Sequence, residues 1–325
     1  MKTHQVPVAL SLAIAALFLG VNKDAVAENY PSKPIRVIVP LAPGSGTDLA
    51  ARAIGQELSK RVGQPVVIEN RTGAGGVVGV EAASRAAPDG YTVVIGSSTT
   101  MAANLFLYKN LSFDPLADFE PIAMVGTMGF AMLVPSSLDV KNVSELVSLA
   151  KANPGQLSYG YGSSAALLCG EMFKSAADID VVKISYKGPP QSLIDLAAGR
   201  IQFVCDPLHS TSLPFIESGK LRPIAFTHTT RSEAAPDVPT MAETDTPMTH
   251  ITWAALFTNK GTPPDVLAKL RTELQASLKA PQVIEQIRQA GFIASDDDHE
   301  ALSKIHRSEI DQIKKLVETT GFSAQ

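Results

Sequence analysis

The sequence predicts an α/β fold in which mostly parallel sheets are flanked by helices. Short apolar runs of strand length alternate along the chain with segments whose apolar residues recur every three or four positions. Continuous apolar runs are typical of strands buried on both faces, as parallel sheets require. The connections are short, so each strand is expected to be followed by a helix that packs on the sheet. A length of 325 residues corresponds to about two domains.

The first three strands are expected at the start of this alternation. The run 35–42 predicts a buried strand, and a helix is expected to begin near Thr47, because apolar residues then recur on one face. Strands over 65–69 and 91–96 follow, with a helix over 77–87 between them.

The alternation continues to the C-terminus, where the segments from residue 264 onward are mostly helical. The further strands are expected near 121–126, 130–134, 157–161, 181–186, 201–205, 222–227 and 251–257. The further helices are expected near 142–153, 165–177, 190–198, 210–218, 264–279, 281–290 and 298–319. No linker or internal repeat marks a boundary between domains, so the domain limits depend on topology.

The N-terminal segment has the features of an export signal. Residues 6–21 are almost wholly apolar, and residues 25–27 form an A-x-A cleavage pattern. The apolar run is shorter than the ~20 residues of a spanning helix, so an uncleaved membrane anchor is the less favoured alternative. Residues 1–27 are therefore predicted to be a signal peptide cleaved near the Ala27–Glu28 bond. The mature protein is expected to be soluble and periplasmic.

The charge balance argues against a nucleic-acid binder, since the 28 Lys and Arg residues are outnumbered by 32 Asp and Glu residues. The two cysteines, Cys169 and Cys205, are too few for a disulfide scaffold or a cysteine-built zinc site. One lies on a predicted helix and the other ends a predicted strand. Two buried thiols are therefore favoured over a disulfide between them.

The common catalytic signatures are missing from the sequence, which predicts neither an enzyme nor a cofactor. It contains no G-x-x-x-x-G-K-[ST], H-E-x-x-H or C-x-x-C motif, and its six histidines show no metal-ligand spacing. Residues 160–165 fit G-x-G-x-x-A, but the next predicted strand, 181–186, does not end in the acid that a dinucleotide site needs. A tight turn is the favoured interpretation of this segment.

A periplasmic serine hydrolase is a remote alternative. Residues 162–166 approach the G-x-S-x-G elbow of hydrolases but end in Ala instead of Gly. Such an enzyme would use Ser163 or Ser164 as the nucleophile, with His209 or His228 as the base.

Three segments rich in Gly and Ser predict a site for a small anion. They cover 40–48, 96–100 and 160–164, which we call the first, second and third loops. Each follows a predicted strand and precedes a predicted helix, whose start offers unpaired N–H donors and a partial positive charge. Such loops gather at the carboxyl ends of parallel strands. Ordinary strand–helix turns also favour these residues, but the presence of three favours a ligand.

Asp48 lies inside the first loop, where a carboxylate would repel a bound anion. It is expected to cap the following helix and to fix the loop by accepting backbone N–H hydrogen bonds. Binding of an ammonium group of the ligand is the less favoured alternative.

The order of several motifs resembles that of the Bug-type solute-binding proteins of the tripartite tricarboxylate transporter (TctC-like) family. The motifs are YPSKPIRVIVPLAPGSGTD at 30–48, ENRTGAGG and PDGYT within 65–92, PDVPT at 236–240 and KGTPPDVLAKL at 260–270. Each motif alone is a weak signal, whereas the combination in this order is specific. The resemblance covers essentially all of the chain that follows the predicted signal peptide.

This resemblance implies a type II periplasmic-binding-protein fold, with a ligand cleft between two α/β domains. Domain 1 is expected to comprise 28–127 and 248–325, and domain 2 to comprise 128–247. The family binds small organic carboxylates through backbone groups, hydroxyls and waters, without a metal. The implied partners are this ligand and the membrane permease subunits of a tripartite transporter, or alternatively a sensor kinase. A monomer without nucleic-acid partners is expected.

The resemblance also assigns candidate ligand-binding residues to the three loops and to one strand end. They are Ala42, Pro43, Gly44, Ser45 and Asp48 in the first loop, Ser97, Ser98, Thr99 and Asn104 in or after the second, Ser163 and Ser164 in the third, and Asp206.

The sequence departs from the family pattern in the same regions. Ser45 stands where a second glycine is usual, and it would be strained if that position needs a positive φ. The third loop is shorter than usual, and Leu167 stands where a histidine is common. Cys205 replaces an aromatic or aliphatic residue.

Overall fold

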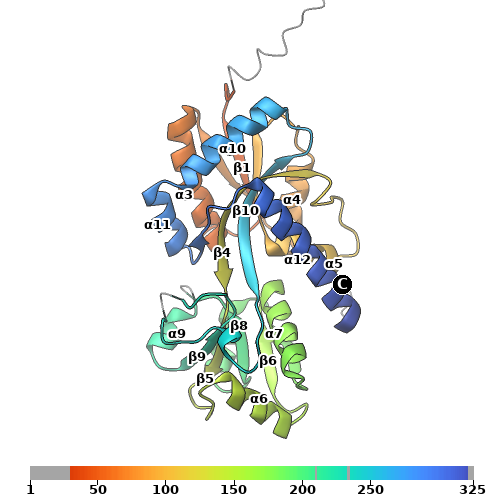
Figure 1. Ribbon diagram of the computed structural model, residues 1–325, viewed down its shortest axis with the longest axis vertical. Coiled ribbons are helices and arrows are strands. Elements are labelled where there is room, and N and C mark those ends of the chain that lie inside the picture. Colours follow the sequence, from red (N-terminus) through yellow and green to blue (C-terminus); the bar gives the residue numbers. More distant parts are fainter. Residues whose placement is uncertain (1–29, 209–210, 233–234, 321–325) are drawn as a thin grey trace, which may run out of the picture.

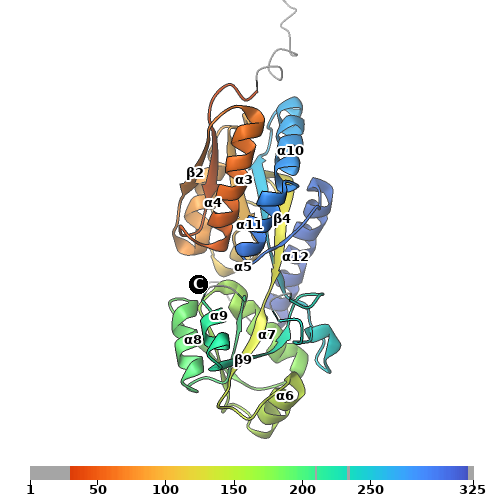
Figure 2. The ribbon, with the colours of Figure 1, turned by 90° about the vertical axis from the view of Figure 1, so that its left-hand side faces the viewer.

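The computed structural model describes residues 30–208, 211–232 and 235–320, which form two α/β lobes stacked along the long axis (Figure 1). Two long strands, β4 (Phe119–Gly129) and β10 (Ile251–Asn259), run between the lobes (Figures 1 and 2). The predicted signal peptide and its cleavage site lie outside the described residues. Of the helices that the structure describes, none combines the length and the apolar character needed to cross a membrane.

The first lobe is built on a six-stranded sheet with the order β11-β4-β10-β3-β1-β2. Besides β4 and β10, it contains β1 (Ile35–Val39), β2 (Val66–Asn70), β3 (Thr92–Ser97) and β11 (Ile293–Ala294). β1 pairs in parallel with β2 and β3, whereas β10 runs antiparallel to β3 and β4. The strand β1 reads IRVIV and is almost wholly buried, because helices cover both faces of the sheet.

The helices of the first lobe divide between the two faces of its sheet. They are α3 (Gly46–Val62), α4 (Val77–Ser84), α10 (Pro264–Leu278), α11 (Pro281–Gln289) and α12 (His299–Thr320). One core contains Ile54 of α3, Leu270 of α10 and Ile287 of α11. Val80 and Leu302 place α4 and α12 in the core on the opposite face. Three short turns complete the lobe, η3 (Ala74–Gly76), η4 (Thr99–Ala103) and α5 (Asn104–Leu107).

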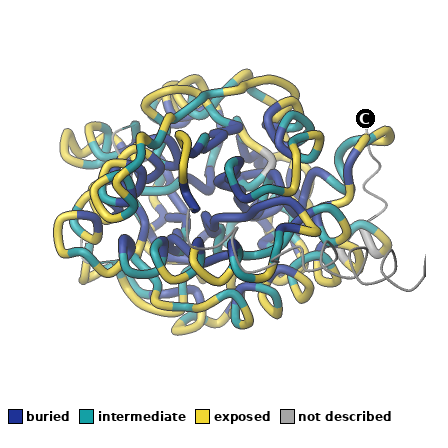
Figure 3. Tube along the Cα trace, turned by 90° about the horizontal axis from the view of Figure 1, so that it is seen from above, coloured by how far each residue is buried: buried dark blue, intermediate teal, exposed yellow. Residues whose placement is uncertain are grey.

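The second lobe has a five-stranded sheet with the order β7-β6-β8-β5-β9. Its strands are β5 (Ala131–Pro135), β6 (Ser158–Tyr161), β7 (Val182–Ser185), β8 (Phe203–Asp206) and β9 (Leu221–Phe226). Its helices are α6 (Val143–Ala152), α7 (Ser164–Ala177), α8 (Pro189–Ala197), α9 (Leu213–Glu217) and the short η5 (Met241–Glu243). A view along the long axis shows the buried segments in the middle and exposed turns around them (Figure 3).

The predicted α/β class is confirmed, and the expected strands and helices have counterparts at or near the expected positions. The strand pairing differs from the expected mostly parallel sheets, because both sheets are mixed. β10 is antiparallel to its two neighbours in the first lobe, and β5 is antiparallel to β8 and β9 in the second. Sheet membership changes between Gly129 of β4 and Ala131 of β5. The domain limits at 127/128 and 247/248 stay predictions.

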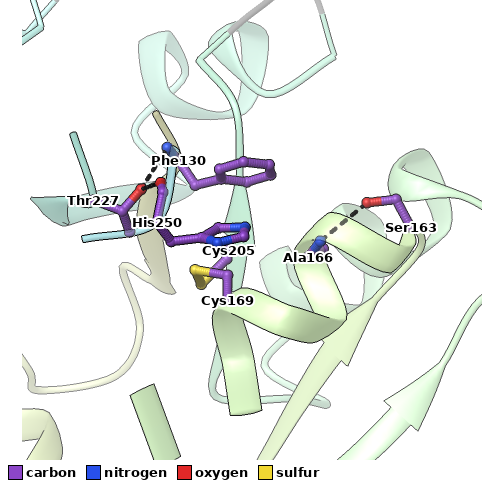
Figure 4. The surroundings of a disulfide bond; sticks show 7 residues. All are labelled: Phe130, Ser163, Ala166, Cys169, Cys205, Thr227 and His250. Carbon is purple, nitrogen blue, oxygen red and sulfur yellow. Dashed lines mark hydrogen bonds between the residues drawn. A yellow bond between two sulfur atoms is a disulfide. The ribbon is translucent and has the colours of Figure 1, made fainter. Parts of the chain in front are cut away.

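The two crossovers between the lobes are joined by the side chain of Thr227. Its hydroxyl accepts the N–H of Phe130 at 2.8 Å and donates to the carbonyl of His250 at 2.6 Å. Phe130 follows β4 and His250 precedes β10, and Figure 4 shows the three residues together. Thr227 is fully buried, so this hydroxyl satisfies two backbone groups that water cannot reach.

We expect Thr227→Val to destabilise the protein. The substitution keeps the shape of the side chain but leaves the Phe130 N–H and the His250 carbonyl without their partner, which costs about 1–3 kcal/mol for each group. Urea unfolding should show a lower midpoint with an unchanged slope. Thr272→Val, at an exposed threonine that bonds the Ala268 carbonyl, is the control. Equal midpoints for the two variants would contradict the role given to Thr227.

Cys169 and Cys205 form a disulfide, so the expectation of two buried thiols is wrong. The bond joins α7 to β8, with the Cα atoms 6.1 Å apart (Figure 4). The helix can lie this close to the sheet because its next residue is a glycine. A Cβ at Gly170 would stand 2.2 Å from the ring of Tyr159 on the neighbouring strand β6. The close approach of the two cysteines, which the sequence did not reveal, therefore depends on the absence of a side chain at Gly170.

Removing this disulfide should lower the free energy of unfolding by roughly 2–4 kcal/mol, because an unfolded chain without the 36-residue closed loop has more entropy. Thermal unfolding with and without dithiothreitol measures the effect. The double variant Cys169→Ser/Cys205→Ser should melt at the temperature of the reduced protein and should not respond to the reductant. A wild-type melting temperature that dithiothreitol leaves unchanged, with reduction verified by mass spectrometry, would overturn this expectation.

Candidate functional site

The first loop turns at Gly44 and enters α3 through Ser45. Gly44 has a φ of 80°, whereas Ser45 has a φ of −66° in the extended region. Serine is therefore unstrained at the position where the family resemblance led us to expect a second glycine. The Ser45 hydroxyl caps α3 by accepting the N–H of Asp48 at 3.3 Å. Ala42, Pro43 and Gly44 are exposed on the outside of this turn.

Asp48 is buried and fixes the first loop from inside. It accepts hydrogen bonds from the Gly44 N–H at 2.9 Å, from Arg52 Nε at 3.0 Å and from Asn70 Nδ2 at 2.8 Å. Burial raises the pKa of Asp48, but the hydrogen bonds from Arg52, Gly44 and Asn70 together hold it below the ordinary value. Asp48 is thus ionised and fully engaged. It fixes the loop as predicted, while the capping residue of α3 is Ser45.

The first turn of α3 keeps two backbone donors for a ligand. Gly46 N–H and Thr47 N–H have no hydrogen-bond partner among the residues that the structure describes. Gly46 also packs directly on the end of α11, since a Cβ there would stand 2.5 Å from the Ala290 carbonyl oxygen and 3.3 Å from the Phe292 ring. This contact fixes where the helix N-terminus and its positive partial charge lie.

The second loop uses its serine hydroxyls within the protein. Ser97 and Ser98 are buried. The Ser97 hydroxyl accepts the backbone N–H of Thr100 at 3.3 Å, and the Ser98 hydroxyl accepts the backbone N–H of Trp253 at 3.1 Å. The hydroxyl-bearing residue of this loop that stays partly exposed is Thr99. The loop therefore offers a ligand fewer hydroxyls than its sequence suggests.

Asn104 joins the second loop to the glycine-rich turn η3. Its Nδ2 donates to the Gly75 carbonyl at 3.1 Å, while its Oδ1 is buried without a partner. Gly76 packs on the other side of η3, where a Cβ would stand 2.5 Å from Thr100 Cγ2 and 3.3 Å from Pro40 Cβ. The ends of β1 and β3 thus meet at η3. η3 was not among the predicted site elements, although the closely spaced glycines at 73, 75 and 76 were a signal for it.

The third loop caps α7 and lies against the loop before α8, which was not among the predicted site elements. Ser163 is exposed, and its hydroxyl accepts the N–H of Ala166 at 3.2 Å (Figure 4). A Cβ on Gly162 would stand 2.2 Å from the backbone of Gly188, the residue before α8. The N-terminus of α8 has no side-chain cap. Ser164 is the first residue of α7.

Asp206 ends β8 and is buried without full hydrogen bonding. Its Oδ2 has no partner, and burial raises the pKa of Asp206 to about 7, although a hydrogen bond with Ser212 acts in the opposite direction. His250 Nε2 is the comparable atom at the crossover, and burial lowers the pKa of His250 to about 4. Buried groups without partners mark places where a ligand or water completes the hydrogen bonding.

The second and third loops face each other across the boundary between the lobes. Leu168 of α7 packs against Ala102 and Ala103, which follow the second loop in η4. Figure 2 shows α5 and α7 at the facing ends of the two lobes. The first loop joins this edge through Pro40, which contacts η3 beside Thr100. The three loops therefore gather where the lobes meet, although they come from residues far apart in the chain.

A cavity of about 540 Å³ also lies between the lobes, close to these loops. Its walls include Gly129 and Phe292 of the first lobe and Leu208 and His228 of the second. Phe292 is the residue that packs on Gly46, and Leu208 follows Asp206 by two positions. None of the predicted site residues that the structure describes is in its wall.

The serine-hydrolase arrangement finds no support in these positions. Ser163 caps α7 through its hydroxyl. His228 is hydrogen-bonded to Thr127 at 3.2 Å and to Thr230 at 3.0 Å. His209 lies outside the described residues.

Comparisons with known proteins point to one family. The family described as tripartite tricarboxylate transporter family receptor matches residues 50–322. BugT of Bordetella pertussis is 34% identical over 288 residues, which cover 86% of this chain and 88% of BugT. The solved structure of R. palustris Rpa4515 with adipate has a TM-score of 0.79 and 30% identity, and covers 91% of this chain and 100% of that one. MatC from Rhodopseudomonas palustris with bound malate has a TM-score of 0.74 and 28% identity, with 89% and 100% coverage.

Asp206→Asn should stabilise the protein at high pH. The pKa of Asp206 is about 7 in the folded state, whereas the unfolded chain has the ordinary pKa of an aspartate. Below that ordinary pKa the carboxyl is neutral in both states. Between the two pKa values only the folded chain keeps the proton, so the stability of the wild type falls as the pH rises to 7. The amide is never ionised, so the variant should be more stable by roughly 2–4 kcal/mol at pH 8.5 and equal to wild type near pH 4. Urea unfolding at both pH values measures this difference. Asp245→Asn, at an exposed carboxylate of the same lobe, is the control, and a difference that does not depend on pH would contradict the assignment.

Proposed function

We propose that this chain, which belongs to the tripartite tricarboxylate transporter receptor family, captures a small organic carboxylate outside the cytoplasm and delivers it to a membrane permease. The family is one of solute receptors and not of enzymes, and the two-lobed α/β fold is that of its periplasmic binding proteins. The ligand class, the permease partner, the periplasmic location of this chain and its monomeric state are the finer parts of the proposal.

The observation that carries the ligand class is the set of backbone donors at the facing ends of the lobes. The first turn of α3 presents the N–H groups of Gly46 and Thr47, and α7 begins at the third loop in the opposite lobe. A helix N-terminus attracts negative charge through its unpaired N–H groups and its dipole. Asp48 does not oppose this attraction strongly, because Arg52 and two N–H donors already balance its charge.

The strength of such a site is in the range that a receptor needs. A hydrogen bond to a charged group contributes roughly 1.5–3 kcal/mol, so three or four would match the ~8 kcal/mol of a micromolar complex before ordering costs. The related structures with adipate and malate hold dicarboxylates, which supports an organic acid as the ligand of this chain.

The two-strand connection between the lobes supports capture by closure. β4 and β10 pair along their length and carry the second lobe, so a change of twist in this pair moves the third loop and Asp206 relative to the first two loops. A carboxylate held by donors of both lobes would favour the closed arrangement.

A thermal-shift series tests the ligand class. The purified protein, freed of carried-over ligand by unfolding and refolding, is mixed with adipate, malate, monocarboxylates, aromatic acids and acidic amino acids. A true ligand at 100 times its dissociation constant stabilises the folded state by about 2.7 kcal/mol and raises the melting temperature. Adipamide and other neutral analogues should give no shift. No shift with any acid would count against the proposal.

A matched pair of variants tests the first loop. Asp48→Asn weakens the contacts that hold the loop, so it should reduce the affinity for the acid that shifts the melting temperature by about tenfold. Asp265→Asn changes the first turn of α10, far from the three loops in the fold, and should leave the affinity unchanged.

Loss of cellular uptake of the same acid on deletion of the gene would separate transport from signalling to a sensor kinase.

A further inference from the structure

A half-buried carboxyl group of the C-terminal helix lies behind the second loop. Glu309 of α12 accepts a hydrogen bond from the indole N–H of Trp253, and it is hydrogen-bonded to the hydroxyl of Ser98. The Ser98 hydroxyl also accepts the backbone N–H of Trp253 at 3.1 Å. Three elements, the second loop, the crossing strand β10 and the helix α12, are thus joined through one carboxyl and one hydroxyl.

The rest of α12 is seated on the same region. His306 Nε2 donates to the Met101 carbonyl at 2.7 Å, and its ring lies 5.6 Å from the ring of Trp253. Further along the helix, Ile313 packs with Ala102 of η4 and with Leu168 of α7. The helix therefore contacts the turn after the second loop and the helix that begins at the third loop.

Glu309 is half-buried, and the groups that are hydrogen-bonded to it are uncharged. Burial raises the pKa of Glu309 to about 7, and the hydrogen bonds from Trp253 and Ser98 act in the opposite direction. Within the described chain Glu309 has no salt-bridge partner. His306 is the titratable group beside it, and burial lowers the pKa of His306, so this ring is neutral in the same range. Trp253 and Ser98, from the other two elements, carry no charge.

We propose that Glu309 is a positioning residue for the second loop and that its protonation state controls how well this loop accepts an organic anion. This inference rests on the proposed function. When Glu309 is ionised, the Ser98 hydroxyl donates its proton to the carboxylate, and a negative charge lies behind the loop. When Glu309 is protonated, its own O–H donates to Ser98 Oγ, the Ser98 proton turns away, and the charge is gone. Both changes favour an anion, so affinity should fall as pH rises.

The first test needs no ligand, because Trp253 is the single tryptophan of the chain and bonds Glu309 itself. Its fluorescence in the ligand-free protein, titrated from pH 5 to 9, should change with a midpoint near 7, the pKa of Glu309. Glu309→Gln mimics the protonated acid and should abolish the transition. Asp206→Asn, which removes the other carboxyl with a pKa of about 7, should leave it in place. A transition that persists in Glu309→Gln would overturn the proposal.

The second test measures affinity with adipate as the probe, by calorimetry at pH 6.5 and 8.5, where simple carboxylic acids are ionised at both values. The affinity of the wild-type protein should fall at least about fivefold between these pH values, and Glu309→Gln should clearly reduce this fall. A fluorescence transition without any change in affinity would show that Glu309 titrates but does not control the loop, and would overturn the proposal. If adipate binds none of the proteins, malate replaces it, and failure of every acid contradicts the proposed function while the fluorescence test still stands.

A second variant covers the case in which Glu309→Gln does not fold. Ser98→Ala removes the link to the loop but keeps the Trp253–Glu309 contact. It should retain the fluorescence transition and weaken the pH dependence of affinity, because the charge of Glu309 still titrates behind the loop. A pH dependence of affinity as large as in the wild-type protein would contradict a role for Ser98 as the connection.

Discussion

The antiparallel pairing of β4 with β10 is the constraint on which the rest of the structure depends. The pairing extends from Asn259 and Phe119 inside the first sheet to Ile251 and Gly129 at the boundary between the lobes. The hydroxyl of Thr227 in the second lobe then accepts the N–H of Phe130, which follows β4, and donates to the carbonyl of His250, which precedes β10. A connection made of two paired strands permits twisting and bending but keeps the two lobes in one register. The helix α12 adds a second link, because its Ile313 packs with Ala102 of the first lobe and Leu168 of the second.

The loops themselves are placed by backbone contacts that only glycine permits. Gly46 lies so close to the Ala290 carbonyl that a Cβ would be 2.5 Å from its oxygen, and Gly162 approaches Gly188 still more closely. Asp48 adds a set of hydrogen bonds that hold the first loop before any ligand arrives. A site whose donors are fixed in advance loses less entropy on binding, which is how a few backbone N–H groups can hold an anion without a cationic side chain.

Two carboxyl groups of the same region, that of the buried Asp206 and that of the half-buried Glu309, would oppose a bound anion when they are ionised. Asp206 and Glu309 lie in different lobes, and burial raises the pKa of each to about 7. A carboxylate in apolar surroundings costs stability, and near the facing ends of the lobes it also repels a negatively charged guest. On the proposed function, the balance between these groups and the helix N-termini is expected to make binding depend on pH in a range where an organic acid keeps its charge.

The sequence by itself determined the elements and the general character of the site. Apolar runs such as IRVIV predict buried strands because period and burial are local properties, and Gly–Ser loops at their ends predict backbone donors for the same reason. Asp48 could be assigned to the loop because its partner Gly44 is four residues away. The family resemblance rested on such local motifs and is confirmed by the family match over residues 50–322.

Only the tertiary structure decided which of these groups meet. The bond between Cys169 and Cys205 depends on the close approach that Gly170 permits to Tyr159, and the antiparallel direction of β10 follows from its return between the lobes. Ser98 turns its hydroxyl inward because Trp253, 155 residues later, and Glu309 lie behind it. Partners so distant along the chain leave no mark in local periodicity, since their meeting is a consequence of how the packed elements are arranged in space.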